Sequence, residues 1–89
     1  MSILDWDVSK IDLDRFAERV RILVAESSLS KAEFAKSLGV SYQTLHQYTR
    51  GFQRPEVQKL YRLSAKGGVS ISWLLGEADI DDRRGGFDD

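Results

Sequence analysis

The chain of 89 residues contains no cysteine, one histidine and one proline, and it has no long apolar run. Without cysteine there is neither a disulfide framework nor a thiolate metal site, and no carboxylates stand at ligand spacing around the single histidine. No apolar stretch approaches the roughly 20 residues that cross a bilayer, and no secretory signal is recognisable. We therefore expect a cytoplasmic protein with no metal, no cofactor and no membrane partner.

Strand patterns are also missing, because no segment alternates apolar and polar residues between hairpin-type turns. Apolar residues instead recur every three or four positions, as helices require. The clearest series follows Asp12, a suitable helix cap. It consists of Leu13, Phe16, Ala17, Val20, Leu23 and Val24. Comparable series with serine caps and glycine stops predict further helices, so we expect an all-α fold.

The segment 29–51 predicts two short helices joined by a tight turn. Ser30 and Glu33 have the spacing of a capping box, in which each side chain satisfies a backbone amide of the other residue. Gly39 follows the first apolar series and suits the left-handed conformation that ends a helix. Ser41 then caps the second helix, so the segment reads as a helix-turn-helix.

Residues 31–50 resemble the helix-turn-helix of the phage Cro/repressor family. The shared features are a small residue, the turn glycine and two later apolar positions, here Ala35, Gly39, Leu45 and Tyr48. The loop 51–55 resembles the Gly-x-x-x-Pro loop of that family, and residues 69–76 resemble its closing helix. The resemblance covers roughly residues 12–76 and implies a compact five-helix bundle that binds double-stranded DNA.

The resemblance also implies which side chains face the DNA groove: Lys31, Tyr42, Gln43 and Gln47. Residue chemistry supports part of this assignment, because glutamine can form two hydrogen bonds with adenine. We expect Tyr42, Gln43 and Gln47 to contact bases. Phosphate contacts are expected from residues at helix starts, helix ends and the following loop. These are Lys31, His46, Arg50 and Arg54.

Charge is distributed unevenly along the chain. The total is −1, which alone argues against a nucleic-acid partner. Residues 30–66, however, hold seven basic and two acidic residues, a balance of +5, while the preceding and following segments carry −2 and −4. A positive centre between acidic ends would orient the domain in the field of a polyanion.

The two ends are expected to differ from the domain at 11–76. Residues 1–10 form an N-terminal extension that includes Trp6, and residues 77–89 read as an acidic, flexible tail. Trp6 and the acidic tail are candidates for contact with a protein partner. The short closing helix has more apolar surface than one core face needs, so Ile71, Trp73 and Leu74 are candidates for a dimer contact as well as for the core.

These features favour a non-enzymatic, sequence-specific transcriptional regulator, a repressor that inserts helix 41–50 into the major groove of a palindromic operator. We expect a homodimer, whose contacts could form only on DNA. Two other interpretations remain open at this point. The chain could be the antitoxin of a toxin–antitoxin pair, or an adaptor that kept the fold and lost DNA binding.

Overall fold

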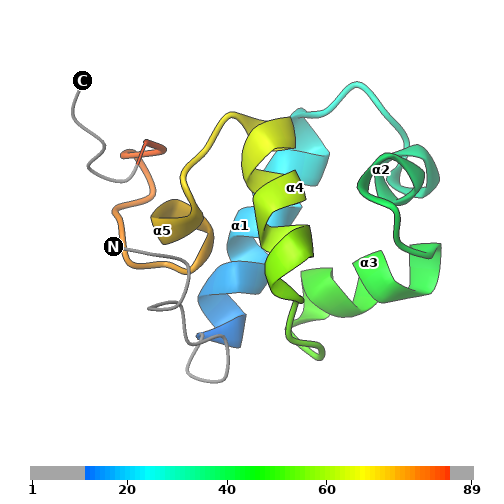
Figure 1. Ribbon diagram of the computed structural model, residues 1–89, viewed down its shortest axis with the longest axis horizontal. Coiled ribbons are helices and arrows are strands. Elements are labelled where there is room, and N and C mark those ends of the chain that lie inside the picture. Colours follow the sequence, from blue (N-terminus) through cyan, green and yellow to red (C-terminus); the bar gives the residue numbers. More distant parts are fainter. Residues whose placement is uncertain (1–11, 85–89) are drawn as a thin grey trace.

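Five helices make up the secondary structure of residues 12–84, the part of the chain that the computed structural model describes (Figure 1). They are α1 (Leu13–Glu26), α2 (Lys31–Leu38), α3 (Tyr42–Arg50), α4 (Val57–Gly67) and α5 (Ile71–Leu74). No strand occurs within these residues, and the predicted all-α fold is confirmed. The N-terminal extension expected at residues 1–10, Trp6 included, lies outside the described residues, as do residues 85–89.

Local hydrogen bonds set the starts of α2 and α3. The Glu33 amide donates to Ser30 Oγ (3.1 Å) and the Ser30 amide donates to Glu33 Oε1 (2.8 Å), which confirms the predicted capping box. The Thr44 amide donates to Ser41 Oγ in the same way (3.0 Å). Between the two helices Gly39 adopts a left-handed conformation with φ of 77°. The predicted helix-turn-helix therefore forms from its own local signals.

A single apolar core joins all five helices. Figure 1 shows α1 and α4 in the middle of the molecule, with α2 and α3 at one end and α5 with the following residues at the other. The rings of Phe16 and Tyr48 meet edge to face at 5.7 Å and so attach α3 to α1. The other large side chains that are fully or almost fully buried include Phe34, Leu38, Leu45, Leu60, Leu63, Trp73 and Leu74.

Residues 77–84 pack on the domain, whereas the sequence predicted a flexible tail from residue 77 onward. The Trp73 indole N–H donates to the carbonyl oxygen of Ile80 (2.9 Å). Both terminal nitrogens of Arg83 donate to the carboxylate of Glu26 at 2.6 Å. The acidic composition suggested a solvated segment, but its backbone carbonyls and Arg83 find partners on α1 and α5. This segment, residues 77–84, is called the strap below.

Candidate nucleic-acid interface

The polar side of α3 faces outward. Tyr42 is 54% exposed, Gln43 and Arg50 are also exposed, and His46 and Gln47 are half-buried. The buried side of the same helix consists of Leu45, Tyr48 and Thr49. Because an α-helix has 3.6 residues per turn, this division places the predicted contact residues of α3 on one accessible surface.

The carboxyl end of α3 is held by a residue that sequence reasoning missed. Arg21 of α1 donates from Nη1 to the carbonyl oxygen of Thr49 at 2.6 Å. That oxygen is one of the last carbonyls of the helix, which have no partner within it. A positive charge there also interacts favourably with the partial negative charge at the carboxyl end of the helix. Only its place on α1, one turn from the core residue Ala17, could have suggested that Arg21 faces another helix.

Lys31 lies beside α3 although it belongs to α2. Its Nζ is 3.0 Å from Nδ1 of His46 and donates to Oγ1 of Thr49 at 3.4 Å. The same ammonium group lies 5.6 Å from the ring centre of Tyr42, whose ring is nearly parallel to that of His46. The structure thus brings together three predicted site residues, Lys31, Tyr42 and His46.

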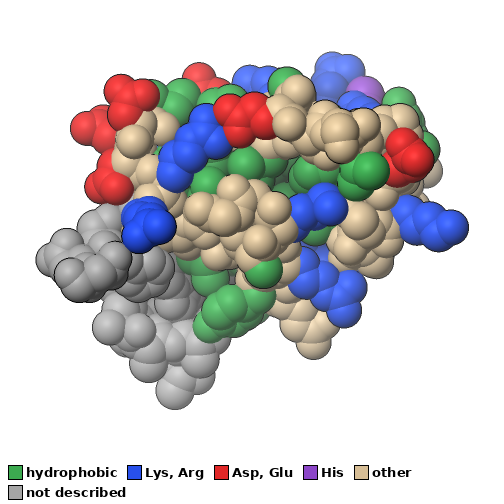
Figure 2. Space-filling model, turned by 90° about the horizontal axis from the view of Figure 1, so that it is seen from above, with side chains coloured by type: hydrophobic (Ala, Val, Ile, Leu, Met, Phe, Trp, Pro, Cys, Tyr) green, Lys and Arg blue, Asp and Glu red, His purple; other side chains and the backbone are tan. Residues whose placement is uncertain are grey.

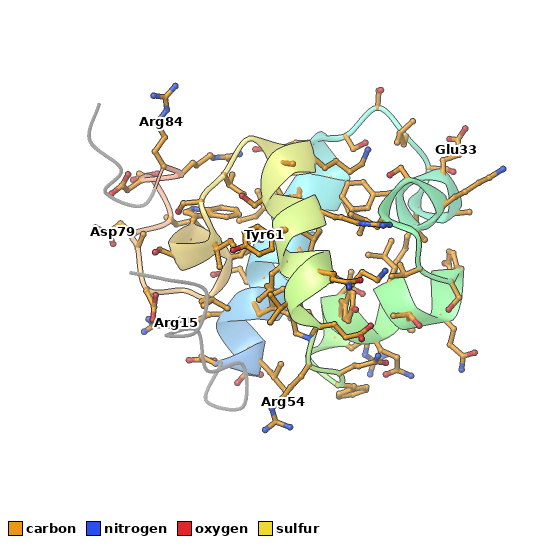
Figure 3. All side chains as sticks on the ribbon, viewed as in Figure 1. Arg15, Glu33, Arg54, Tyr61, Asp79 and Arg84 are labelled. Carbon is orange, nitrogen blue, oxygen red and sulfur yellow. The ribbon has the colours of Figure 1, made fainter. Side chains whose placement is uncertain are left out.

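The end of α3 and the loop after it carry the other predicted phosphate contacts. Arg50 and Arg54 are both exposed, and Figure 3 shows Arg54 extending away from the domain. The guanidinium of Arg50 lies 4.9 Å from the ring centre of Phe52, which is 66% exposed. Phe52 was not among the predicted site residues. Its amide donates to the carbonyl oxygen of Gln47 (3.0 Å), so the loop is tied back to α3.

The charges of the folded domain follow the segregation in the sequence. Figure 2 shows several acidic side chains gathered near one end of the molecule, with basic side chains beside them, and further basic side chains over the other half. Residues 30–66, which include α2 and α3, carry the balance of +5. Glu33, one of the two acidic residues there, is engaged locally, because hydrogen bonds from the Ser30 backbone and hydroxyl lower the pKa of its carboxyl group.

The three candidates for a dimer contact are part of the core. Trp73 and Leu74 are 0% exposed and Ile71 is 8% exposed. Of the two roles that the sequence left open for them, the structure shows the core and leaves little of their surface for a second subunit. The reason is that α5 packs between α1 and the strap, and this arrangement covers the apolar surface that looked excessive for a short helix.

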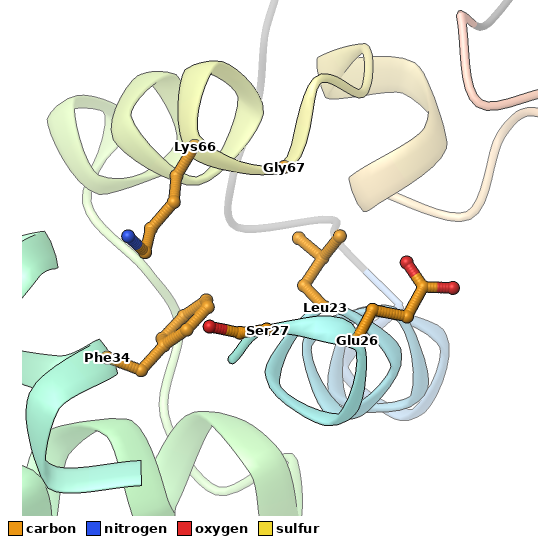
Figure 4. Close-up of a pocket in the computed structure, with 6 residues that line it drawn as sticks. All are labelled: Leu23, Glu26, Ser27, Phe34, Lys66 and Gly67. Atoms are coloured by element: carbon orange, nitrogen blue, oxygen red, sulfur yellow. The ribbon is translucent and has the colours of Figure 1, made fainter. Parts of the chain in front are cut away.

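Pockets, metal-ligand clusters and membrane-spanning helices among the described residues would indicate other kinds of site. A pocket of about 220 Å³ lies between α1, α2 and α4, and none of its lining residues belongs to the predicted site (Figure 4). Within residues 12–84 no three histidine, cysteine or acidic side chains come together as metal ligands. The described helices are all too short or too polar to cross a membrane.

The sequence profile described as helix-turn-helix matches residues 20–74, more than half of the chain. The chain belongs to this family. The chain is 31% identical over 70 residues to the cryptic phage CTXphi transcriptional repressor RstR of Vibrio cholerae. That match covers 76% of this chain and 63% of RstR.

Two further relatives are longer regulators. The chain is 35% identical over 66 residues to the HTH-type transcriptional regulator PrtR of Pseudomonas aeruginosa, a match that covers 74% of this chain. It is 34% identical over 61 residues to an uncharacterised HTH-type transcriptional regulator of Haemophilus influenzae, with 68% of this chain covered. In both cases the match spans only 25% of the relative.

A solved structure has the same architecture. It is the solution structure of a SOS-response transcriptional repressor, LexA, from Eubacterium rectale, with a TM-score of 0.67 and 27% sequence identity. The superposition covers 86% of this chain and 77% of that chain. The helix-turn-helix of this chain therefore lies in a helical domain of the same kind as that of the LexA structure.

Proposed function

We propose that this chain is a DNA-binding transcriptional repressor that inserts α3 into the major groove of a palindromic operator. The observation that carries the proposal is the exposed polar side of α3, held on a capped two-helix unit in a chain of the helix-turn-helix family. An α-helix with its side chains is about 10–12 Å in diameter and fits the major groove, which is about 12 Å wide. The nine residues of α3 extend over roughly 13 Å of its axis.

Gln43 and Gln47 are proposed to read bases, because each amide can donate to and accept from one adenine. Tyr42 is the third proposed base contact, through its exposed ring at the start of α3. Lys31, His46, Arg50 and Arg54 are proposed to lie near phosphates, where positive charge and N–H donors position the domain without reading sequence. The positive balance of residues 30–66 supports DNA over a role as a protein adaptor.

The operator is proposed to be read by a two-fold dimer. A domain of this size contacts too few base pairs for genomic specificity, so two copies on half-sites about ten base pairs apart, or a multiple of that, supply the rest. The dimer contact does not involve Trp73, because that side chain is buried. Footprints of a single protein on one non-palindromic half-site would contradict this arrangement.

The test separates base reading from backbone binding on the same helix. Selection from a random duplex pool defines the operator, and Gln43→Ala is then expected to weaken operator binding by about 1–3 kcal/mol while leaving affinity for random DNA nearly unchanged. Arg50→Ala is expected to weaken both. Both variants must keep wild-type helicity and melting temperature. Equal losses from Gln43→Ala on the two DNAs would show that Gln43 does not read sequence.

A further inference from the structure

The contact between Lys31 and His46 determines where the imidazole proton lies. An ammonium group has three N–H donors and no acceptor, so the ring nitrogen that it meets must accept. Nζ of Lys31 is 3.0 Å from Nδ1 of His46. The neutral imidazole of this contact therefore carries its proton on Nε2, an assignment that follows from the hydrogen bond.

The Tyr42 ring lies beside the His46 ring, and Thr49 holds the Lys31 ammonium next to it. The ring of Tyr42, one helical turn earlier on α3, lies 7° from parallel with it at a centroid distance of 6.4 Å. The Thr49 hydroxyl donates to the carbonyl oxygen of His46 (2.7 Å) and accepts from Nζ of Lys31 (3.4 Å). The ring is thus bracketed by Tyr42 and Lys31, and among the described residues no hydrogen-bond partner meets Nε2.

We propose that Lys31 is a positioning residue that makes His46 a reader of guanine in the operator. This inference rests on the proposed function and deepens it, since it moves His46 from the phosphate-contacting set to the base-reading set. His46 lies on α3 between Tyr42 and Gln47, and it is half-buried rather than covered. With Nδ1 occupied, only the Nε2–H donor at the far end of the ring is available to DNA.

A single fixed donor discriminates among base edges in a way that a glutamine amide does not. In the major groove guanine presents two acceptors, N7 and O6, side by side, whereas cytosine presents a donor that would oppose Nε2–H. The expected preference opposite His46 is guanine first and cytosine last. Without Lys31, the ring could place its proton on either nitrogen, and Nε2 could then also accept.

The first experiment examines the protein without DNA. Nitrogen-15 spectra of the imidazole at neutral pH distinguish the two neutral tautomers, and the Nε2–H form is expected in the wild type. In Lys31→Met, which keeps the aliphatic stem, a mixture of tautomers is expected. A wild-type ring protonated on Nδ1 would overturn the inference while leaving DNA binding itself unaffected.

The second experiment compares the bases that variants select from a random duplex pool. Lys31→Met is expected to reduce the preference for guanine opposite His46 by about twofold, because an equal mixture of tautomers leaves the donor form about half populated, and to leave the preferences opposite Gln43 and Gln47 in place. His46→Gln is expected to keep a base preference at this position but to broaden it from guanine to adenine as well, because the glutamine amide also accepts. Arg50→Ala serves as the control that lowers affinity on every sequence without changing the base preference.

The outcomes separate this inference from the proposed function. If the wild type selects an operator and Lys31→Met selects the same base opposite His46 with the same ratio, the positioning role is wrong and DNA binding stands. If the wild type enriches no sequence, the proposed function fails and the base-reading role of His46 fails with it. The tautomer of the free protein then shows whether the Lys31–His46 contact itself was correct.

Discussion

The two ends of the domain use arginine in opposite ways. At the end with α3, Arg50 and Arg54 are exposed on the surface proposed to meet DNA. At the end with α5 and the strap, Arg15, Arg19 and Arg83 are engaged with backbone carbonyl oxygens or with a carboxylate. The comparison teaches that arginine content alone does not locate a nucleic-acid surface.

The difference has its origin in the backbone. α5 has only four residues and is followed by irregular chain, so many of its carbonyl oxygens have no partner within a helix. Arg19 donates from Nη1 to the carbonyl oxygens of Trp73 (3.0 Å) and Ala78 (3.2 Å), and Arg15 donates to that of Gly76 (2.9 Å). Several guanidinium groups there satisfy backbone carbonyl oxygens. On α3 the Arg21 guanidinium does so for the carbonyl oxygen of Thr49, while Arg50 and Arg54 stay exposed.

The largest expected effect concerns salt at the α3 end. If Lys31, Arg50 and Arg54 lie near phosphates, a dimer engages on the order of six of them and releases the corresponding counterions. Affinity for DNA should then fall about a thousandfold between roughly 50 and 200 mM salt. Fluorescence anisotropy over this range measures how DNA affinity depends on salt concentration, and an affinity that does not change with salt would contradict the DNA-binding proposal.

Replacing the buried arginine at the opposite end should mainly affect stability. Arg19→Met removes a charged donor from two carbonyl oxygens, each bond being worth about 1.5–3 kcal/mol. Part of this loss is offset, because the buried Nε of Arg19 has no hydrogen-bond partner within residues 12–84. We expect the free energy of unfolding to fall by about 3 kcal/mol.

The matched control for that experiment is Arg50→Met, the same change on an exposed side chain of α3. It should alter the free energy of unfolding by less than about 0.5 kcal/mol and should weaken DNA binding. Urea unfolding monitored by circular dichroism measures both variants. Equal destabilisation by the two substitutions would contradict the division of roles between the two ends.

A smaller effect is expected at the helix caps. Ser41→Ala removes the hydroxyl that accepts from the Thr44 amide at the start of α3, and it should destabilise the domain by about 1 kcal/mol. Glu56 occupies the corresponding cap of α4 but makes no side-chain cap hydrogen bond. Glu56→Ala should therefore have little effect, and a loss equal to that of Ser41→Ala would show that cap hydrogen bonds do not explain the difference.

The smallest effect concerns the ion pair that ties the strap to α1. The hydrogen bond from Arg83 holds the pKa of Glu26 below its ordinary value of 4.5. Because this pKa is lowered by folding, the pair stabilises the domain above pH 4.5, and this contribution is lost as the pH falls through the lowered value.

Thermal melting of the wild type and of Arg83→Met measures this contribution. Their melting temperatures should differ slightly at neutral pH and converge in acid. The reason is that protonated Glu26 carries no negative charge to pair with the guanidinium of Arg83. The pair is exposed, so the difference should be modest and should shrink in high salt. A difference that persists unchanged in acid would mean that Arg83 acts through packing on Trp73 instead.

The prediction from sequence was accurate where the signals were local. Ser30 with Glu33, Gly39 and Ser41 act on backbone groups within a few residues, and the structure confirms these caps and this turn. The outward position of Gln43 likewise follows from helical periodicity. The contacts of these residues with DNA stay predictions, because their partner is another molecule.

The prediction failed where the partner is distant in the chain. Trp73 was a candidate for a dimer contact as well as for the core, and the segment from residue 77 onward was expected to be flexible. The sequence did not show that the strap covers α5 and that it is bonded there by Arg19 of α1 and Trp73 of α5. Composition described the strap as acidic and polar, but it could not reveal that the carbonyl oxygen of Ala78 meets the Arg19 guanidinium and that of Ile80 the Trp73 indole.

The sequence by itself determined the helices, their caps and the polar side of α3, since each depends on groups no more than about four residues apart. Only the tertiary structure decided which cations are structural and which remain on the surface. Arg19 and the Trp73 carbonyl are separated by 54 residues, and Arg83 and Glu26 by 57. Such pairs form because packing of the core brings together unsatisfied polar groups whose proximity no local pattern encodes.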